Sequence, residues 1–338
     1  MERLKTAMVG VGGFGAGRRR RMRKTGLFDI VACFDFNEDT LRKACEEEDA
    51  TACGSFEELL EVPDTDVMVV STGATSHAEY TIGALNAGKH VFVEKPLAST
   101  ADEIQRMIAA KEETGLVVGM GHKYEPAHPQ NQLVKQYIEK GKIGTVTAIE
   151  ANKCHSGALA GHPDGWRFDP GKNPGGMLFQ CGVHAMHTLR YLFGEIEEVS
   201  SFMRNDVVAE TETPDATLTM LRFDSGLVGS LNCYHTTAYK HSLRVFGTAG
   251  NLYLETVRNK AWYQERKQNE FEAVEPVEEL PEPEADHNDN LRSFAHAIRH
   301  GGTPYPSIYD GAKPVAVCLA AVESEKTGRK VAVGNLGW

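Results

Sequence analysis

Three separated groups of residues have types and spacings suited to chemistry. Glycines recur as Gly10-x-Gly12-x-x-Gly15 directly after an apolar run. The first allows a tight turn, the second lets backbone approach a pyrophosphate, and the third lets a helix pack closely. Glu94-Lys95-Pro96 would deliver an ammonium to the end of a strand, and His184, four residues after Gln180, would supply an imidazole. Together these groups indicate a cleft that binds a dinucleotide and transfers a hydride.

Strands and helices are expected to alternate along the first third of the chain. Apolar runs of strand length are separated by stretches of helix length, a pattern typical of β-α-β units and of a doubly wound parallel sheet. Thr100, followed three residues later by Glu103, is a candidate capping box. The expected strands span residues 6–11, 30–35, 67–71, 90–94 and 117–120, and the expected helices 18–24, 38–48 and 77–87.

Beyond residue 123 the pattern changes to β-rich segments. Turn signals at residues 224–226 and 248–250 separate apolar runs that should be antiparallel neighbours. We therefore predict an α/β protein with an N-terminal Rossmann domain at residues 1–122. An α+β domain with a mostly antiparallel open sheet is expected at residues 123–338. Its predicted strands are 146–151, 199–203, 216–223, 227–234 and 242–247, with helices at 131–140, 288–300 and 312–326.

Composition narrows the classes of partner. The net charge of -11 argues against nucleic acid, because nucleic-acid binding depends on basic residues that neutralise phosphates. The seven cysteines are scattered, without the CxxC spacing of a zinc or redox site, and reduced thiols are expected. We see neither a signal-peptide pattern nor an apolar run of membrane-spanning length. These features predict a cytoplasmic protein with a small polar ligand and no membrane partner.

Asp35 indicates which dinucleotide is bound. It ends the second expected strand about twenty residues after Gly15, where a carboxylate can accept from ribose hydroxyls and repel a 2'-phosphate. This favours NAD over NADP, although NADP stays possible because of an arginine run at residues 18–21. The simpler interpretation of that run is a solvated helix face. The expected cofactor-binding residues are Gly10, Gly12, Gly13, Phe14, Gly15, Asp35, Phe36, Ser71, Thr72, Gly73, His77, Glu94 and Lys95.

The motifs together resemble the Gfo/Idh/MocA family, named for glucose-fructose oxidoreductase and inositol dehydrogenase, along nearly the whole chain. The matching segments are residues 10–15, 71–77, 87–96, 140–144, 166–167 and 175–184. The resemblance implies a two-domain oxidoreductase acting on a sugar, a polyol or a related hydroxy or keto compound. It places Lys95 and His184 in the catalytic positions and Arg167 where sugar reductases use an arginine near substrate. It also implies a homodimer or homotetramer formed through the second domain's sheet.

Two departures from the family pattern bear on the chemistry. Gly73-Ala74 replaces the usual Pro-Asn after Thr72, and Gln180 stands where most family dehydrogenases carry aspartate. A carboxylate four residues before His184 would share its helical face and raise its pKa. Gln180 can only orient a hydroxyl or carbonyl through hydrogen bonds. We therefore expect His184 to remove the hydroxyl proton while Lys95 stabilises the developing alkoxide.

Other residues are weaker candidates. Lys123 and Tyr124 follow the last expected strand of the first domain and should face the substrate. Trp166 could stack on a sugar or nicotinamide ring, or equally serve as a core aromatic. Cys181, His184 and His187 are spaced three apart, which permits metal binding, but a packed helix is the simpler interpretation and no metal is expected. His155, His162 and His235 are treated as structural or surface residues.

Two alternative functions remain open. A redox-neutral enzyme could keep NAD tightly bound and use transient oxidation for epimerisation, elimination or glycoside cleavage. A non-catalytic cofactor-binding protein is the other alternative, which the presence of Lys95, Arg167 and His184 disfavours.

Overall fold

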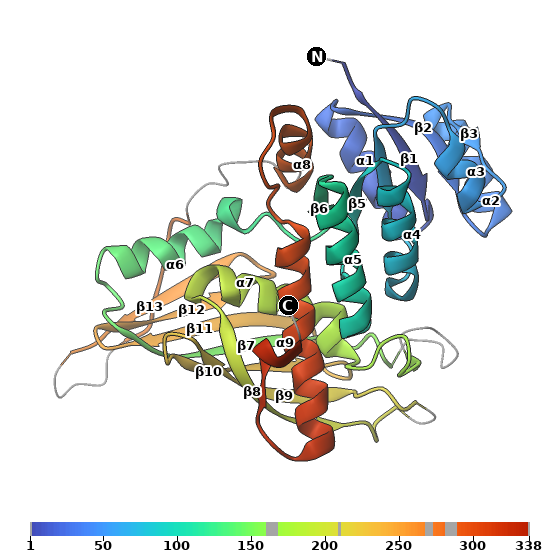
Figure 1. The fold of residues 1–338 in the computed structure, drawn as a ribbon. Coiled ribbons are helices and arrows are strands. Elements are labelled where there is room, and N and C mark those ends of the chain that lie inside the picture. The colour runs from blue at the N-terminus through green and yellow to red at the C-terminus, as the bar shows by residue number, and fades with distance from the viewer. Residues whose placement is uncertain (1, 160–167, 209–210, 268–272, 281–288, 337–338) are drawn as a thin grey trace. The chain divides into compact units, whose positions relative to one another are not determined.

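The computed structural model describes the chain except residues 1, 160–167, 209–210, 268–272, 281–288 and 337–338. The chain divides into two compact units, each assembled from two segments (Figure 1). The first unit comprises Met1–Tyr124 and Ala285–Lys313, and the second Glu125–Glu284 and Pro314–Trp338.

The first unit is built on a six-stranded sheet of order β3-β2-β1-β4-β5-β6. All of its pairings are parallel, and helices connect successive strands, so the predicted Rossmann-like sheet is confirmed. Its strands are β1 (Leu4–Val9), β2 (Phe28–Phe34), β3 (Thr51–Ala52), β4 (Val67–Val70), β5 (His90–Val93) and β6 (Val118–Met120). Its helices include α1 (Phe14–Thr25), α2 (Glu38–Glu48), α3 (Phe56–Glu61), α4 (Ala74–Asn86), α5 (Ala101–Thr114) and α8 (Asp289–His300).

Local sequence signals determine where several of these helices begin and end. The predicted capping box is present at α5, where the Thr100 side chain accepts from the Glu103 N–H and the Glu103 carboxylate accepts from the Thr100 N–H. The side chain of Asn37 caps α2 in a similar way. Gly26 and Gly115 end α1 and α5 in the left-handed conformation that glycine adopts without a Cβ clash.

Residues 285–313 belong to the first unit, whereas the predicted boundary assigned everything after 122 to one domain. The reason is the apolar face of α8, on which Leu291, Phe294 and Ala295 join the core of the Rossmann sheet. The Phe294 ring stacks on Phe28 and meets Phe92 edge-on, at centroid distances of 6.4 and 5.5 Å. The separate roles assigned to the two predicted domains stay a prediction.

The second unit contains a nine-stranded sheet of order β14-β13-β12-β11-β7-β10-β9-β8-β15. Only the β7–β10 pair among these described strands is parallel, so the mostly antiparallel sheet is confirmed. Its strands are β7 (Val146–Cys154), β8 (Ile196–Arg204), β9 (Ala216–Phe223), β10 (Val228–Tyr234), β11 (Lys240–Gly247), β12 (Gly250–Glu255), β13 (Lys260–Glu265), β14 (Glu275–Pro276) and β15 (Val331–Ala332). The other elements are α6 (Pro129–Glu139), α7 (Val183–Phe193), the one-turn helices η1 (Glu125–Ala127), η3 (Leu178–Gly182) and η4 (Val333–Leu336), and most of α9 (Ile308–Thr327).

One face of this sheet is covered and the other is open. On the covered face, the Phe193 ring of α7 packs edge-on against Phe223 of β9. Strand β9 alternates strictly, with Thr217, Thr219, Leu221 and Phe223 buried and the residues between them turned outward. On the open face Phe202, Leu218, Met220 and Val228 are 69, 49, 57 and 45% exposed.

The structure also contains elements that the sequence patterns did not predict. Helix α3 and the strands β3, β13, β14 and β15 were not expected. Each is short or lies beside a polar stretch, so its hydrophobic periodicity is weak. Among the described helices, none combines the length and apolarity needed to cross a membrane.

Candidate active site

The glycine loop joins β1 to α1 and has the tight packing expected of it. A Cβ on Gly10 would lie 2.8 Å from the Ser71 carbonyl carbon and from the Thr72 methyl, and Gly10 has a positive φ of 80°. A Cβ on Gly15 would collide with the Gly10 carbonyl oxygen. Because glycine has no Cβ, α1 can start close to the end of β1. The backbone N–H groups at the start of α1 thus follow a buried strand, the arrangement that binds a pyrophosphate.

Asp35 lies beside this loop, as predicted from its spacing. Its Oδ2 accepts hydrogen bonds from the backbone N–H groups of Val11, at 2.9 Å, and of Gly12, at 3.3 Å. Its Oδ1 accepts from the Asn37 N–H at 3.0 Å. A carboxylate is therefore fixed at the end of β2, against the glycine turn. Its predicted contact with a ribose stays a prediction.

Two large apolar side chains are exposed around the loop. Phe14 and Phe36 are 71 and 80% exposed, which is unusual for phenylalanine. The Lys95 ammonium lies 5.5 Å from the centre of the Phe14 ring. A cation at this distance from an aromatic face is attracted to it. The lysine that follows β5 is therefore directed towards the start of α1 and the glycine loop.

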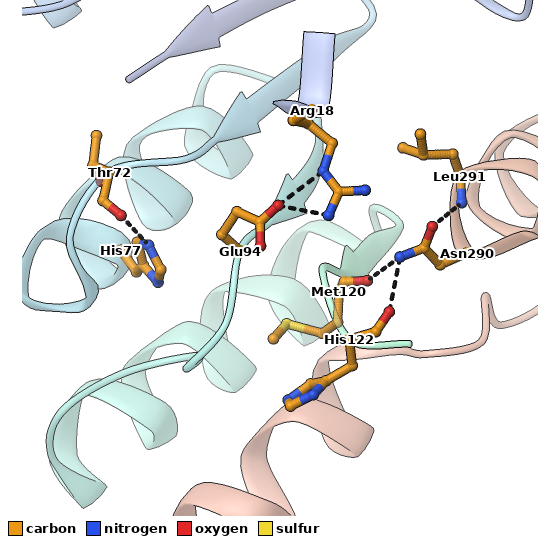
Figure 2. Close-up of polar contacts among 8 residues, drawn as sticks. All are labelled: Arg18, Thr72, His77, Glu94, Met120, His122, Asn290 and Leu291. Carbon is orange, nitrogen blue, oxygen red and sulfur yellow. Dashed lines mark hydrogen bonds and ion pairs between the residues drawn. The ribbon is translucent and has the colours of Figure 1, made fainter. Parts of the chain in front are cut away.

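Glu94, the residue before Lys95, is buried in an ion pair with Arg18 of α1 (Figure 2). Arg18 donates through Nε and Nη2 to Glu94 Oε1, at 2.8 and 2.5 Å, and its guanidinium lies over the Phe92 ring. Burial alone would raise the pKa of Glu94, but the charge and hydrogen bonds of Arg18 outweigh it, and the pKa lies below its usual value. Glu94 is therefore an anion within the protein interior.

The arginine run is only partly a solvated helix face, so that interpretation is corrected. Arg18 and Arg19 are 3 and 5% exposed. Arg19 donates to Glu47 and Glu48 of α2 at 2.9 and 2.7 Å. Arg18 and Arg19 are thus engaged with carboxylates of the same unit, which weakens the case for the run as a 2'-phosphate site.

His77 lies in the first turn of α4 and is 1% exposed. Its Nδ1 is 2.9 Å from the carbonyl oxygen of Pro96, and its Nε2 is 3.1 Å from that of Thr72. Burial lowers the pKa of His77, although both carbonyls and Glu94 favour the charged ring. Direct contact of His77 with a cofactor stays a prediction.

Asn290 of α8 holds the chain where it leaves β6 (Figure 2). Its amide nitrogen donates to the carbonyls of Met120 and His122, at 3.4 and 2.8 Å. Lys123 and Tyr124 follow immediately, and the Tyr124 ring packs edge-on against Tyr305 of the same unit. The sequence patterns did not identify Asn290 as a residue that supports the site, because its partners are backbone atoms nearly 170 positions away.

His184 and Gln180 come from different kinds of helix. His184 lies in the first turn of α7, but Gln180 lies in η3, a π-helical turn in which the Val183 N–H reaches the Leu178 carbonyl. A π turn has more residues per turn than an α-helix. The two side chains therefore do not share one face of a regular α-helix, which is what their spacing of four residues had predicted. Gln180 is 8% exposed. π turns are frequent at functional sites, and no sequence signal predicted this one.

The helix that carries His184 is anchored by a buried carboxylate. The Thr188 hydroxyl lies 2.9 Å from Glu125 Oε1 and 3.0 Å from the His184 carbonyl oxygen, so these two acceptors share its single O–H. Asn131 of α6 donates to the other oxygen of Glu125, which is 1% exposed. Glu125 thereby links η1, α6 and α7. Its isolated position in the sequence, between a tyrosine and a proline, did not identify it.

Among the described residues, no group of three or more histidine, cysteine or acidic side chains, Cys181, His184 and His187 included, is arranged so that it could hold a metal ion. The Cys181 sulfur is instead 3.8 Å from His155 Nε2. His155 Nδ1 accepts from the Gly157 N–H at 2.8 Å, which assigns the proton of the neutral ring to Nε2. The His155 ring meets the His235 ring edge-on, at 4.7 Å between centroids.

Some predicted site residues cannot be placed in this geometry. Trp166 and Arg167, like His162, lie outside the described residues. Lys95 belongs to the first unit, whereas Gln180 and His184 belong to the second. The convergence of Lys95 and His184 on one substrate carbon therefore stays a prediction. All seven cysteines lie in the described part of the chain, and none forms a disulfide there.

Comparison with known proteins identifies the family. Residues 4–122 match the oxidoreductase family with an NAD-binding Rossmann fold, and residues 131–253 match the GFO/IDH/MocA C-terminal domain. A 1,5-anhydro-D-fructose reductase of Ensifer adhaerens is 31% identical over 278 residues, covering 81% of this chain and 82% of that protein. The chain belongs to the GFO/IDH/MocA family. A scyllo-inositol 2-dehydrogenase (NAD(+)) of Bacillus subtilis (strain 168) is 30% identical, covering 81% of this chain and 79% of that protein.

Solved structures of the family share the fold. An oxidoreductase of Desulfitobacterium hafniense DCB-2, described as a putative NADPH-dependent enzyme, superposes with a TM-score of 0.89 at 25% identity, covering 99% of both chains. A levoglucosan dehydrogenase in complex with NADH and levoglucosan gives 0.86 at 23% identity, covering 98% of this chain and all of that one. The first unit of this GFO/IDH/MocA protein is thus an NAD-binding Rossmann domain, as the glycine pattern predicted.

Proposed function

We propose that this protein is an NAD-dependent dehydrogenase or reductase of carbohydrate metabolism. It transfers a hydride between a nicotinamide and the secondary alcohol or ketone of a sugar, polyol or sugar derivative. The observation that carries the proposal is the placement of Lys95, whose ammonium lies 5.5 Å from the Phe14 ring at the start of α1, beside the glycine loop of an NAD-binding Rossmann domain. Relatives at 30 and 31% identity, named for anhydrofructose and inositol chemistry, support the substrate class.

The chain's own residues divide the work in this proposal. The glycine loop and Asp35 hold the dinucleotide, and the bound nicotinamide supplies the hydride acceptor or donor. Lys95 stabilises negative charge on the substrate oxygen, and His184 takes up the hydroxyl proton in the oxidative direction. Gln180 orients the substrate through its amide, and Lys123, Tyr124, Trp166 and Arg167 supply further substrate contacts.

NAD is the preferred cofactor in this proposal. Asp35 fixes a negative charge against the glycine turn, where a 2'-phosphate would be repelled. Arg18 and Arg19 are engaged in ion pairs, so neither is a ready partner for such a phosphate. NADP therefore binds more weakly than NAD.

Turnover assays with sugars and polyols test the proposal. Scyllo-inositol, myo-inositol and levoglucosan would be supplied with NAD or NADP, and 1,5-anhydro-D-fructose with NADH or NADPH, while absorbance at the nicotinamide band is followed. We expect at least one compound to be turned over, with NAD preferred. His184→Ala and Lys95→Met should each abolish that turnover, and full activity in either variant would contradict the assigned roles.

The same assay separates the alternative functions. Dinucleotide that stays bound through gel filtration, with substrate consumed but no NADH released, would identify a redox-neutral enzyme. Binding of NADH without consumption of any compound would favour a non-catalytic cofactor-binding protein. Gln180, in place of the usual carboxylate, is the feature that keeps the redox-neutral alternative worth testing.

We also propose a homodimer or homotetramer in the cytoplasm, assembled through the open face of the second unit's sheet. The apolar part of that face consists of Phe202, Leu218, Met220 and Val228. Several exposed apolar side chains on one face indicate an interaction surface, whereas isolated ones do not. Seven thiols without a disulfide in the described structure are consistent with a reducing compartment.

A further inference from the structure

We propose that His77 is a positioning residue that sets the spacing between the two loops of the dinucleotide site carrying Thr72 and Lys95. The inference rests on the proposed function, because it assigns these loops to cofactor and substrate. It differs from the direct cofactor contact expected from the sequence.

The ring of His77 bridges two strand ends. Thr72 follows β4, and Pro96 follows β5. Nε2 lies 3.1 Å from the Thr72 carbonyl and Nδ1 lies 2.9 Å from the Pro96 carbonyl, so one rigid ring contacts both loops. The neutral ring carries one N–H, so it donates to one of these carbonyls at a time. Figure 2 shows the contact with Thr72 and places the ring near Glu94. Ligands bind at these carboxyl ends of the strands in open α/β sheets.

Burial argues for positioning and against direct contact. His77 is 1% exposed, and each ring nitrogen already faces a backbone carbonyl. A dinucleotide would therefore find no ring nitrogen to bind. A buried polar side chain with such partners stabilises one arrangement of the groups around it.

Both loops contact parts of the site that tolerate little movement. A Cβ on Gly10 would lie 2.8 Å from the Thr72 methyl, so the glycine turn packs against the first loop. Pro96 is bonded directly to Lys95, whose ammonium lies over Phe14. A change in the spacing set by His77 would thus move the dinucleotide cradle relative to the ammonium.

Three substitutions separate the two contacts. An asparagine amide nitrogen reaches about as far as Nδ1 and keeps a donor for the Pro96 carbonyl, whereas a glutamine amide nitrogen reaches about as far as Nε2 and keeps one for Thr72. Leucine keeps bulk but no donor. The measurements are the dissociation constant of NADH, by fluorescence, and kcat with the compound that the turnover assays identify.

We expect His77→Leu to weaken NADH binding and to lower kcat, each by about tenfold, the size of a lost buried hydrogen bond. His77→Asn should recover kcat more than NADH affinity, and His77→Gln should recover NADH affinity more than kcat. The inference is overturned if His77→Leu matches the wild type in both quantities, or if neither amide variant improves on leucine.

His90→Leu is the matched control. His90 lies at the other end of β5, and its Nδ1 accepts from the Val117 N–H at 3.0 Å. The control loses a partly buried hydrogen bond of the same sheet, so it should lower the melting temperature without changing kcat or the NADH dissociation constant. If His77→Leu does not fold, the two amide variants carry the comparison.

Failure of the inference can be told from failure of the proposed function. A wild-type protein that neither binds NADH nor turns over any test compound contradicts the proposed function, and this inference with it. A wild type that does both, alongside an unaffected His77→Leu, contradicts the inference alone.

Discussion

The guanidinium of Arg18 and the carboxylate of Glu94 form a buried ion pair at the end of the strand that leads into Lys95. Because neither side chain is more than 12% exposed, removing one partner would leave the other charge without compensation in a poorly solvated position. The pair therefore connects the stability of the Rossmann unit to the placement of the proposed catalytic lysine.

Arg18→Met should lower the free energy of unfolding by roughly 3–5 kcal/mol, because it leaves the Glu94 carboxylate without its ion-pair partner. Chemical denaturation followed by circular dichroism would measure the loss. Arg42→Met is the control, since Arg42 pairs with Asp39 and Glu46 on the surface, where such pairs contribute about 0–1 kcal/mol. Equal losses in the two variants would contradict the role assigned to the buried pair.

Lys95→Met should reduce kcat by at least about a hundredfold, because a preorganised charge that stabilises a developing alkoxide contributes an effect of this order. The NADH dissociation constant should change by only a few-fold. Lys111→Met provides a comparison, since the Lys111 ammonium also lies over a ring, that of Tyr309, yet takes no part in the proposed chemistry. A kcat loss of the same size in Lys111→Met would show that Lys95 has no special role.

Asp35→Asn should weaken NADH binding by about tenfold or more. It should also reduce the preference of the protein for NADH over NADPH. Asparagine still accepts from the Val11 and Gly12 N–H groups, but it loses the charge that strengthens a hydrogen bond and repels a 2'-phosphate. Fluorescence titrations with both dinucleotides would measure the two constants. An unchanged NADH-to-NADPH ratio would mean that Asp35 does not select the cofactor.

The pKa values of the buried His77 and the partly buried His90 predict acid sensitivity. Burial lowers the pKa of both His77 and His90 in the folded protein. The unfolded chain takes up protons near its ordinary pKa of about 6.5 while the folded chain does not, so stability is greatest above that pH. The free energy of unfolding should therefore fall as the pH drops from 7.5 to 5.5.

Denaturation curves across that range would measure this slope, and His90→Asn should flatten it by removing one titrating group. His300→Asn is the comparison, because His300 is exposed. A stability that stays constant or rises on acidification would contradict the prediction.

Met220→Lys should dissociate the proposed oligomer, because it places a charge in the apolar part of the open sheet face, where Met220 is 57% exposed. Light scattering coupled to gel filtration would give the mass. Val257→Lys changes a residue of comparable exposure, 49%, away from that face and should leave the mass unaltered. A monomeric wild type, or an oligomer that survives Met220→Lys, would exclude assembly through this face.

Most of the Rossmann unit could be predicted from the sequence because its signals are local. The glycine spacing, the apolar strand runs and the capping box at Thr100 each act within a few residues, and the structure contains all of them. The turns at 224–226 and 248–250 likewise predicted antiparallel neighbours that are observed. Short elements such as α3 and β14 were not predicted, because they contain too few residues to show a hydrophobic periodicity.

The amino-acid sequence by itself determined the cofactor-binding loop, the family and the alternation of strands and helices, since these depend on neighbouring residues. Only the tertiary structure decided that Arg18 is an interior partner of Glu94, that α8 returns to the first unit, and that His77 bridges two loops. Burial and hydrogen bonding between distant segments are properties of packing. The type of a charged or polar residue therefore does not tell whether it faces solvent or supports the site.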